Sequence, residues 1–174
     1  MKRSKTSKSW MNEHVSDPYV HKAKIAGYRS RAAFKLLEAN EKFNFFTKKM
    51  NVVDLGSAPG SWSQVISQMT GCNGNIFALD LLEMVPIKNV EFLKGDFREQ
   101  EMLDSLEKKL GKTSLDLVIS DMAPNISGIK TSDQAAIIHL NELALQFSAY
   151  WLKPNGCFLV KSFVGAEFDG FVAE

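Results

Sequence analysis

Residues 52–60 read Val-Val-Asp-Leu-Gly-Ser-Ala-Pro-Gly, and this stretch decides the predicted fold. An apolar run that ends in an acidic residue predicts a buried strand, and Gly56 and Gly60 predict a tight turn into a helix. The spacing is D-x-G-x-x-x-G and differs from the G-x-G-x-x-G of dinucleotide-binding proteins. A turn of this form predicts a pocket for an adenosine-type cofactor and favours S-adenosyl-L-methionine.

Predicted helices and strands alternate along the rest of the 174 residues. Hydrophobic periodicity and turn residues predict helices at about 30–40, 61–70, 98–110 and 133–153, and strands at 51–55, 76–80, 90–93, 115–121 and 157–163. This alternation predicts a Rossmann-like α/β fold, with a mostly parallel sheet and helices on both faces. We expect a basic, partly flexible N-terminal arm at residues 1–25 and a single domain at residues 26–174.

The composition is that of a globular protein with one core, being 45% hydrophobic and 24% charged. The two cysteines, Cys72 and Cys157, do not form a disulfide framework, which favours a reducing, cytoplasmic location. The sequence has no C-x-x-C pair or histidine cluster, so it predicts no metal site. No apolar stretch reaches membrane-spanning length, so no membrane association is expected.

The charge is distributed unevenly. Residues 1–35 hold nine Lys or Arg and two acidic residues, a net charge of +7, whereas residues 36–174 hold twelve basic and eighteen acidic residues, a net charge of −6. A basic arm on an acidic body predicts a polyanionic partner such as nucleic acid, although a solvated terminus is the simpler alternative. The basic residues expected to contact an RNA backbone are Lys22, Lys24, Arg29 and Arg31.

Four aspartates follow the same rule of position. Asp54, Asp80, Asp96 and Asp121 each lie at or just past the carboxyl end of a predicted strand. Ligands of parallel sheets bind outside these ends, so the four acids predict one binding edge. Asp80 lies where a carboxylate would hold both ribose hydroxyls of an adenosine, and Asp96 could accept a hydrogen bond from the adenine amino group.

The glycine turn supplies further cofactor candidates. Gly56 and Gly60 would let the backbone approach a ligand closely, because a side chain at either position would collide with it. Trp62 could contact the cofactor, but its helical spacing with Val65 and Met69 favours core packing about equally.

Lys161 interrupts the apolar run Cys-Phe-Leu-Val-Lys-Ser-Phe at 157–163. Lysine is rarely buried without a partner, so this position predicts a role at the carboxyl end of the strand, with a water-exposed strand position as the alternative. Burial and a second cation would make Lys161 a base at neutral pH. Lys35 is the candidate for that cation, or an ordinary surface lysine.

Several motifs in combination identify a family. They lie at 17–20 (Asp-Pro-Tyr-Val), 28–38 (Tyr-Arg-Ser-Arg-Ala-Ala-Phe-Lys-Leu-Leu-Glu), 54–64, 120–128 (Ser-Asp-Met-Ala-Pro-Asn-Ile-Ser-Gly) and 159–163 (Leu-Val-Lys-Ser-Phe). Over nearly its whole length the chain resembles the FtsJ/RrmJ-type RNA ribose 2′-O-methyltransferases. The resemblance implies that residues 26–174 form a methyltransferase domain and that S-adenosyl-L-methionine is its cofactor.

The resemblance also carries over individual roles. It implies a catalytic set of Lys35, Asp121 and Lys161, and cofactor contacts from Gly60, Trp62, Asp80, Asp96 and Asp121. The family's fourth catalytic residue, a glutamate, and its closing helix and last two strands would follow Glu174, where this sequence stops, so we expect a C-terminally truncated domain.

The substrate implied by the resemblance is a uridine of large-subunit (23S) ribosomal RNA in the assembled subunit, modified by a monomeric enzyme. Two alternatives stay open. One is a ribose methyltransferase of transfer RNA or of the messenger-RNA cap. The other is a non-catalytic RNA-binding factor of ribosome assembly. A dehydrogenase is least favoured, because the dinucleotide glycine spacing is absent.

Overall fold

Five parallel strands form the centre of the molecule in the order β3-β2-β1-β4-β5. The computed structural model describes residues 17–71, 74–165 and 168–173. The strands are β1 (Val52–Leu55), β2 (Ile76–Asp80), β3 (Val90–Lys94), β4 (Leu115–Ser120) and β5 (Leu152–Val160). The helices are α2 (Pro18–Ile25), α3 (Ala32–Phe43), α4 (Ser61–Thr70), α5 (Gln100–Leu110), α6 (Lys130–Trp151) and α7 (Phe168–Ala173).

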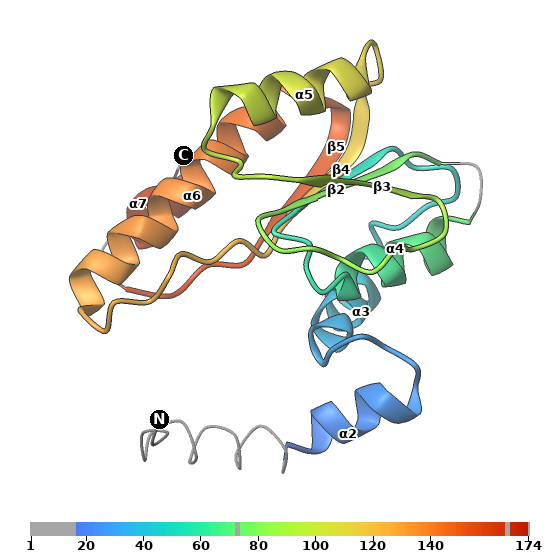
Figure 1. The fold of residues 1–174 in the computed structure, drawn as a ribbon, viewed down its shortest axis with the longest axis horizontal. Helices are drawn as coiled ribbons and strands as arrows, with labels where there is room; N and C mark the ends of the chain where they lie inside the picture. Colours follow the sequence, from blue (N-terminus) through green and yellow to red (C-terminus); the bar gives the residue numbers. More distant parts are fainter. Residues whose placement is uncertain (1–16, 72–73, 166–167, 174) are drawn as a thin grey trace.

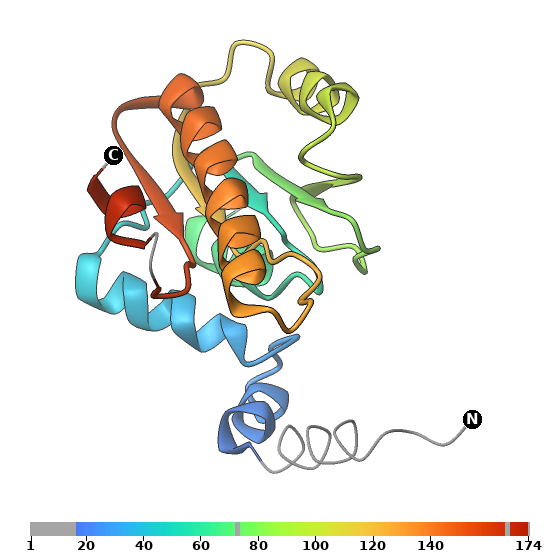
Figure 2. The same cartoon turned by 90° about the vertical axis from the view of Figure 1, so that its left-hand side faces the viewer.

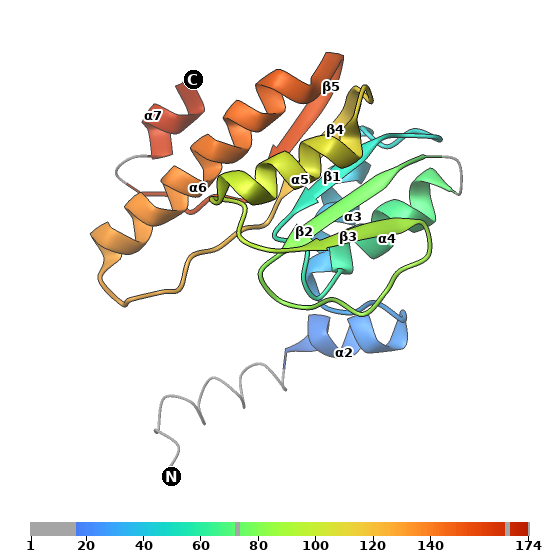
Figure 3. The ribbon, with the colours of Figure 1, turned by 45° about the horizontal axis from the view of Figure 1, so that its top comes forward.

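Helices cover both faces of this sheet, as Figures 1 and 3 show. The side chains of β1 alternate between two cores because successive residues of a strand point to opposite faces. Val53 and Leu55 pack with Leu106 of α5 and with residues of α6. Val52 packs on the other face, among residues of α3 and α4 such as Leu36 and Ile66. The predicted Rossmann-like α/β fold is therefore confirmed.

The structure corrects the predicted end of the chain. The strand expected at 157–163 is β5, which begins at Leu152, directly after α6, and ends at Val160. Leu115 pairs with Leu152 and Leu117 pairs with Cys157. Residues 153–156 of β5 therefore lie opposite the single residue Asp116 of β4, as in a large β-bulge. This irregularity accommodates Pro154, which has no N–H to donate to a sheet. Lys161 consequently lies just past β5 and not within it.

The N-terminal part contains a helix that the sequence pattern did not predict. Asp17 caps α2, since its carboxylate accepts a hydrogen bond of 2.8 Å from the backbone N–H of Tyr19, and Pro18 takes the first helical position. Only Ala23 of this helix is buried, so α2 has almost no hydrophobic stripe to detect. Residues 1–16 of the arm expected at residues 1–25 lie outside the described residues.

Ser30 joins two helices at their first turns. Its hydroxyl accepts a hydrogen bond of 3.2 Å from the backbone N–H of Ala32 and shares another of 2.7 Å with the hydroxyl of Ser61. The start of α3 is therefore fixed to the start of α4. Helix α7, at the C-terminal end of the described chain, contacts α6, and in Figure 2 it is seen beside β5. No helix among the described residues is long and apolar enough to cross a membrane.

Candidate cofactor and active site

The carboxyl ends of the strands meet at one edge of the sheet, where the predicted acids gather. Asp80 ends β2, Asp96 lies two residues past β3, and Asp121 directly follows β4. Lys161 directly follows β5. Because β4 lies beside β1 and the chain reverses its direction of winding there, this edge is the crevice where α/β sheets bind ligands.

Asp54 differs from the other three acids. It lies inside β1 and is fully buried. Contrary to the prediction, its side chain is therefore not exposed at this edge. Its Oδ2 accepts a hydrogen bond of 2.6 Å from the Ser63 hydroxyl of α4, whereas Oδ1 has no partner among the described residues. Burial raises the pKa of the Asp54 carboxyl from 3.8 to about 7, and the hydrogen bond from Ser63 opposes this rise. The structure thus places Asp54 inside the sheet, bonded to α4.

The glycine turn, residues 56–60, is shaped by the protein's own packing. Gly56 and Gly60 have φ values of 75° and 98°, a region in which L side chains are strained. A Cβ on Gly56 would lie 2.7 Å from the backbone nitrogen of Met122, and one on Gly60 would lie 2.6 Å from the sulfur of Met84. The sequence predicted that glycine makes room for a ligand, and the structure adds that neighbouring protein atoms already require it.

Asp80, at the end of β2, is hydrogen-bonded to the glycine turn. Its Oδ2 accepts a hydrogen bond of 2.8 Å from the backbone N–H of Ala58, in the glycine turn, and its Oδ1 accepts one of 2.7 Å from the N–H of Leu82. Each carboxylate oxygen keeps a further lone pair for a hydroxyl donor. The Asp80 carboxylate is therefore fixed in position and still able to accept ligand hydrogen bonds.

Arg98 holds Asp96 in a fork, a contact that the sequence analysis missed. Its Nε donates to Oδ1 at 2.9 Å and its Nη2 to Oδ2 at 2.5 Å. These hydrogen bonds hold the pKa of the Asp96 carboxyl below its ordinary value of 3.8. The sequence signal that could have predicted this contact is the arginine two residues after Asp96. The ionised Asp96 is thereby oriented, with lone pairs left for an amino-group donor.

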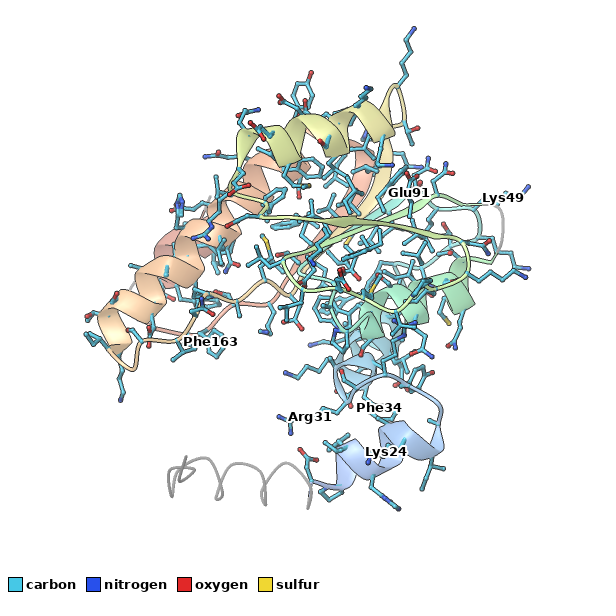
Figure 4. The ribbon with its side chains drawn as sticks, in the orientation of Figure 1. Lys24, Arg31, Phe34, Lys49, Glu91 and Phe163 are labelled. Atoms are coloured by element: carbon cyan, nitrogen blue, oxygen red, sulfur yellow. The ribbon has the colours of Figure 1, made fainter. Side chains whose placement is uncertain are left out.

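Asp121 and Lys161 form an ion pair across adjacent strands. The backbone N–H of Asp121 donates to the carbonyl of Leu55 at 3.0 Å, and that of Lys161 donates to the carbonyl of Ser120 at 2.9 Å. Both side chains are partly buried, with 24% and 29% of their surfaces exposed. The Lys161 ammonium also lies 5.9 Å from the ring centre of Phe163, which Figure 4 labels. A cation and a carboxylate therefore face the same edge as Asp80 and Asp96.

The structure does not join Lys35 to this pair. Lys35 is exposed on α3 and makes no ion pair within the part of the chain that the structure describes. Trp62 is buried in the core, and its indole N–H donates to the carbonyl of Ala32 at 2.8 Å. Of the two interpretations of Trp62, core packing is the one that the structure supports.

The four residues predicted to bind RNA have different environments. Lys22 and Lys24 are exposed on α2, and the Lys22 ammonium lies 5.1 Å from the ring centre of Phe34. Arg31 is exposed and paired with Asp17 (Figure 4). Arg29 differs from the other three, because three of the five N–H groups of its guanidinium donate to backbone carbonyls.

Two buried hydroxyls complete the polar lining. Ser57 Oγ, in the glycine turn, and Ser120 Oγ, at the end of β4, have no hydrogen-bond partner among the described residues. Buried polar atoms are normally paired, so an unpaired hydroxyl marks a place where a ligand or water donates or accepts. Within residues 17–71, 74–165 and 168–173, no three His, Cys, Asp or Glu side chains converge as a metal site requires.

Comparisons with known proteins agree with this geometry. Residues 28–174 match the model of the FtsJ-like methyltransferases. The ribosomal RNA large subunit methyltransferase E of Methylobacillus flagellatus is 58% identical over 172 residues, which cover 99% of this chain and 83% of the relative. The protein of the same name from Dechloromonas aromatica is 53% identical over 174 residues, which cover 100% of this chain and 85% of the relative.

Solved structures extend the likeness. One from Plasmodium falciparum, provisionally described as a ribosomal RNA methyltransferase, has a TM-score of 0.78 and 31% identity and is matched over 84% of both chains. The MycE methyltransferase, solved with Mg and SAH, has a TM-score of 0.56 at 17% identity, with 77% of this chain and 35% of that chain covered, so it shares the fold alone. With the family model matched from residue 28 to residue 174, the chain belongs to the FtsJ-like methyltransferase family.

Proposed function

We propose that this protein transfers a methyl group from S-adenosyl-L-methionine to a ribose 2′-hydroxyl of RNA. The observation that carries the proposal is the Asp121–Lys161 ion pair on the edge that also holds Asp80 and Asp96. Such an arrangement offers an acidic cofactor site beside a group able to handle a proton. Family membership supports methyl transfer, and the names of the two relatives favour large-subunit ribosomal RNA as the substrate.

The residues present fit the proposed cofactor. S-adenosyl-L-methionine has a sulfonium and an ammonium, and a nearby carboxylate stabilises positive charge of this kind. Asp80 would hold the ribose hydroxyls, Asp96 the adenine amino group, and Asp121 the methionine end. The unpaired hydroxyls of Ser57 and Ser120 supply further polar partners. The bound cofactor supplies an electrophilic methyl group.

In this proposal, the protein's own side chains remove the proton of the ribose 2′-hydroxyl. A ribose hydroxyl is a very weak acid and must lose its proton as its oxygen forms a bond to carbon. Lys161 takes that proton after it has released its own, and Asp121 holds its amino group in position. Proton transfer of this kind contributes about 10²–10⁴-fold to a rate, and alignment of the reacting atoms contributes more. Lys35 adds positive charge on the RNA side from the exposed face of α3.

The finer substrate is a uridine of 23S ribosomal RNA, methylated within the assembled large subunit in the cytoplasm. The resemblance described above and the relatives' names support this choice. Lys22, Lys24 and Arg31 form the proposed RNA-backbone surface, with the exposed ring of Tyr19 beside them. The chain spans 83–85% of the length of these two relatives.

The test is methyl transfer from radiolabelled cofactor to large subunits, free ribosomal RNA, transfer RNA and capped messenger RNA. Nuclease digestion and chromatography identify the modified nucleotide. We expect 2′-O-methyluridine from large subunits lacking the modification. Label in transfer RNA or the cap would support the alternative methyltransferases. Binding to subunits with no transfer to any RNA would support an assembly factor.

A further inference from the structure

Arg29 connects three separate parts of the chain. Its Nη1 donates to the carbonyl of Pro59 at 2.9 Å and to that of Val85 at 2.6 Å, and its Nη2 donates to the carbonyl of Pro86 at 3.0 Å. Its backbone N–H donates to Oε1 of Gln64, on α4, at 3.1 Å. The guanidinium thus bridges the glycine turn and the segment 81–89, which follows Asp80.

The 81–89 segment has few other attachments. Leu82 and Val85 are 68% and 73% exposed, and only Met84 of this segment is buried. The carbonyl of Lys88 accepts a hydrogen bond of 2.8 Å from the Ser67 hydroxyl, at the far end of the segment. Without Arg29, the carbonyls of Val85 and Pro86 would lose these hydrogen bonds. The segment that follows Asp80 would then be held less firmly, by the buried Met84, the Glu83–Lys94 ion pair and the hydrogen bond to Lys88.

We propose that Arg29 is a positioning residue for the cofactor site and not a phosphate contact. By holding the glycine turn against the 81–89 segment, it fixes the two backbone N–H groups that bond to the Asp80 carboxylate. Arg29 also precedes α3, so it ties the helix that carries Lys35 to the cofactor edge. The inference rests on the proposed function, because it takes S-adenosyl-L-methionine as the ligand of this edge.

Replacing Arg29 by lysine separates the two roles. A phosphate contact requires a positive charge, which lysine keeps. Three carbonyls in two segments require the planar fork of a guanidinium, which an ammonium does not reproduce. Arg29→Lys should therefore preserve RNA affinity and weaken cofactor binding. The matched control is Lys42→Gln, which removes a charge from an exposed position near the end of α3.

The experiment measures the affinity of the full chain for S-adenosylhomocysteine by calorimetry, its affinity for a ribosomal RNA fragment by filter binding, and steady-state methyl transfer. Arg29→Lys should raise the cofactor Kd by about tenfold, as losing one hydrogen bond to a charged group does. The KM for the cofactor should rise while kcat stays near the wild-type value. Lys42→Gln should leave cofactor affinity unchanged.

The outcomes separate the inference from the proposed function. If the wild-type chain fails to bind S-adenosylhomocysteine, the cofactor assignment fails. If the wild type binds and Arg29→Lys binds equally well, the positioning role is overturned. If Arg29→Lys melts below the assay temperature, Gln64→Ala replaces it, because Gln64 also holds the carbonyl of Gly27, at 2.8 Å. That variant should weaken cofactor binding by about two- to tenfold, and no change there would overturn the inference.

Discussion

Asp54 makes the stability of this protein depend on pH in an uncommon direction. Its carboxyl is fully buried with one oxygen unpaired, and its pKa rises from 3.8 to about 7 on folding. Between pH 4 and pH 7 the unfolded chain therefore releases this proton while the folded chain keeps it. The contribution of Asp54 to the free energy of unfolding is thus fully present below pH 4 and is lost as pH rises to about 7.

The magnitude follows from the shift. A rise of about three pKa units corresponds to about 4 kcal/mol, at roughly 1.4 kcal/mol for each unit. Asp54→Asn has a neutral side chain of the same shape, whose oxygen can still accept the hydrogen bond from Ser63. It should remove this part of the pH dependence. At pH 8 it should be the more stable protein by up to about 3 kcal/mol, after a cost of at least about 1 kcal/mol for the unpaired amide.

Urea unfolding at pH 5, 6, 7 and 8, followed by tryptophan fluorescence, measures both proteins. The difference between them isolates Asp54 from the other titrating groups. The reasoning is refuted if the difference between variant and wild type stays constant from pH 5 to pH 8. It is also refuted if the wild type gains stability relative to Asp54→Asn as the pH rises.

Four further substitutions test the site. Lys161→Ala should keep cofactor affinity and slow methyl transfer by about 10²–10⁴-fold in a single-turnover assay, and wild-type turnover would remove Lys161 from the mechanism. Asp80→Asn should weaken S-adenosylhomocysteine binding by about tenfold or more in calorimetry, since a carboxylate hydrogen bond is lost. Lys24→Gln should reduce the slope of log RNA affinity against log salt by about 0.7–0.9, and an unchanged slope would exclude a phosphate contact there. Gly56→Ala should lower the free energy of unfolding by at least about 2 kcal/mol in urea, because its Cβ would lie 2.7 Å from the Met122 nitrogen.

Most of the sheet could be predicted because its strands are short apolar runs between turn residues. The exception is β5, whose first half contains Pro154, Asn155 and Gly156, residues typical of turns. These residues keep their turn character, with a φ of 65° at Asn155, and β5 begins before them only because Leu152 pairs with Leu115 of β4. Such pairing is not visible in the local pattern. The sequence pattern did not predict α2 because this helix buries only Ala23 and has no apolar stripe. The sequence feature that marks its start is the capping pair Asp17-Pro18.

The Asp121–Lys161 pair could be expected from topology alone, because parallel strand ends meet at one edge. The role of Arg29 could not be expected. Arg29 bonds to carbonyls 30 to 57 residues away, and every residue type has a carbonyl, so the sequence contains no pattern for this contact. The assignment of Arg29 to RNA rested on charge, which is common to phosphate contacts and to structural forks.

The irregular pairing of β5 also determines where the chain tolerates changes of length. Residues 153–156 lie between the pairs Leu115–Leu152 and Leu117–Cys157, so an insertion there can loop out without altering any later pair. A deletion between Cys157 and Val160 has a different effect, because side chains alternate along a strand. The loss of one residue there would turn every later side chain to the other face of the sheet, and Lys161 would then point away from Asp121. Length variation among functional homologues should therefore fall in residues 153–156 and spare the four residues before Lys161.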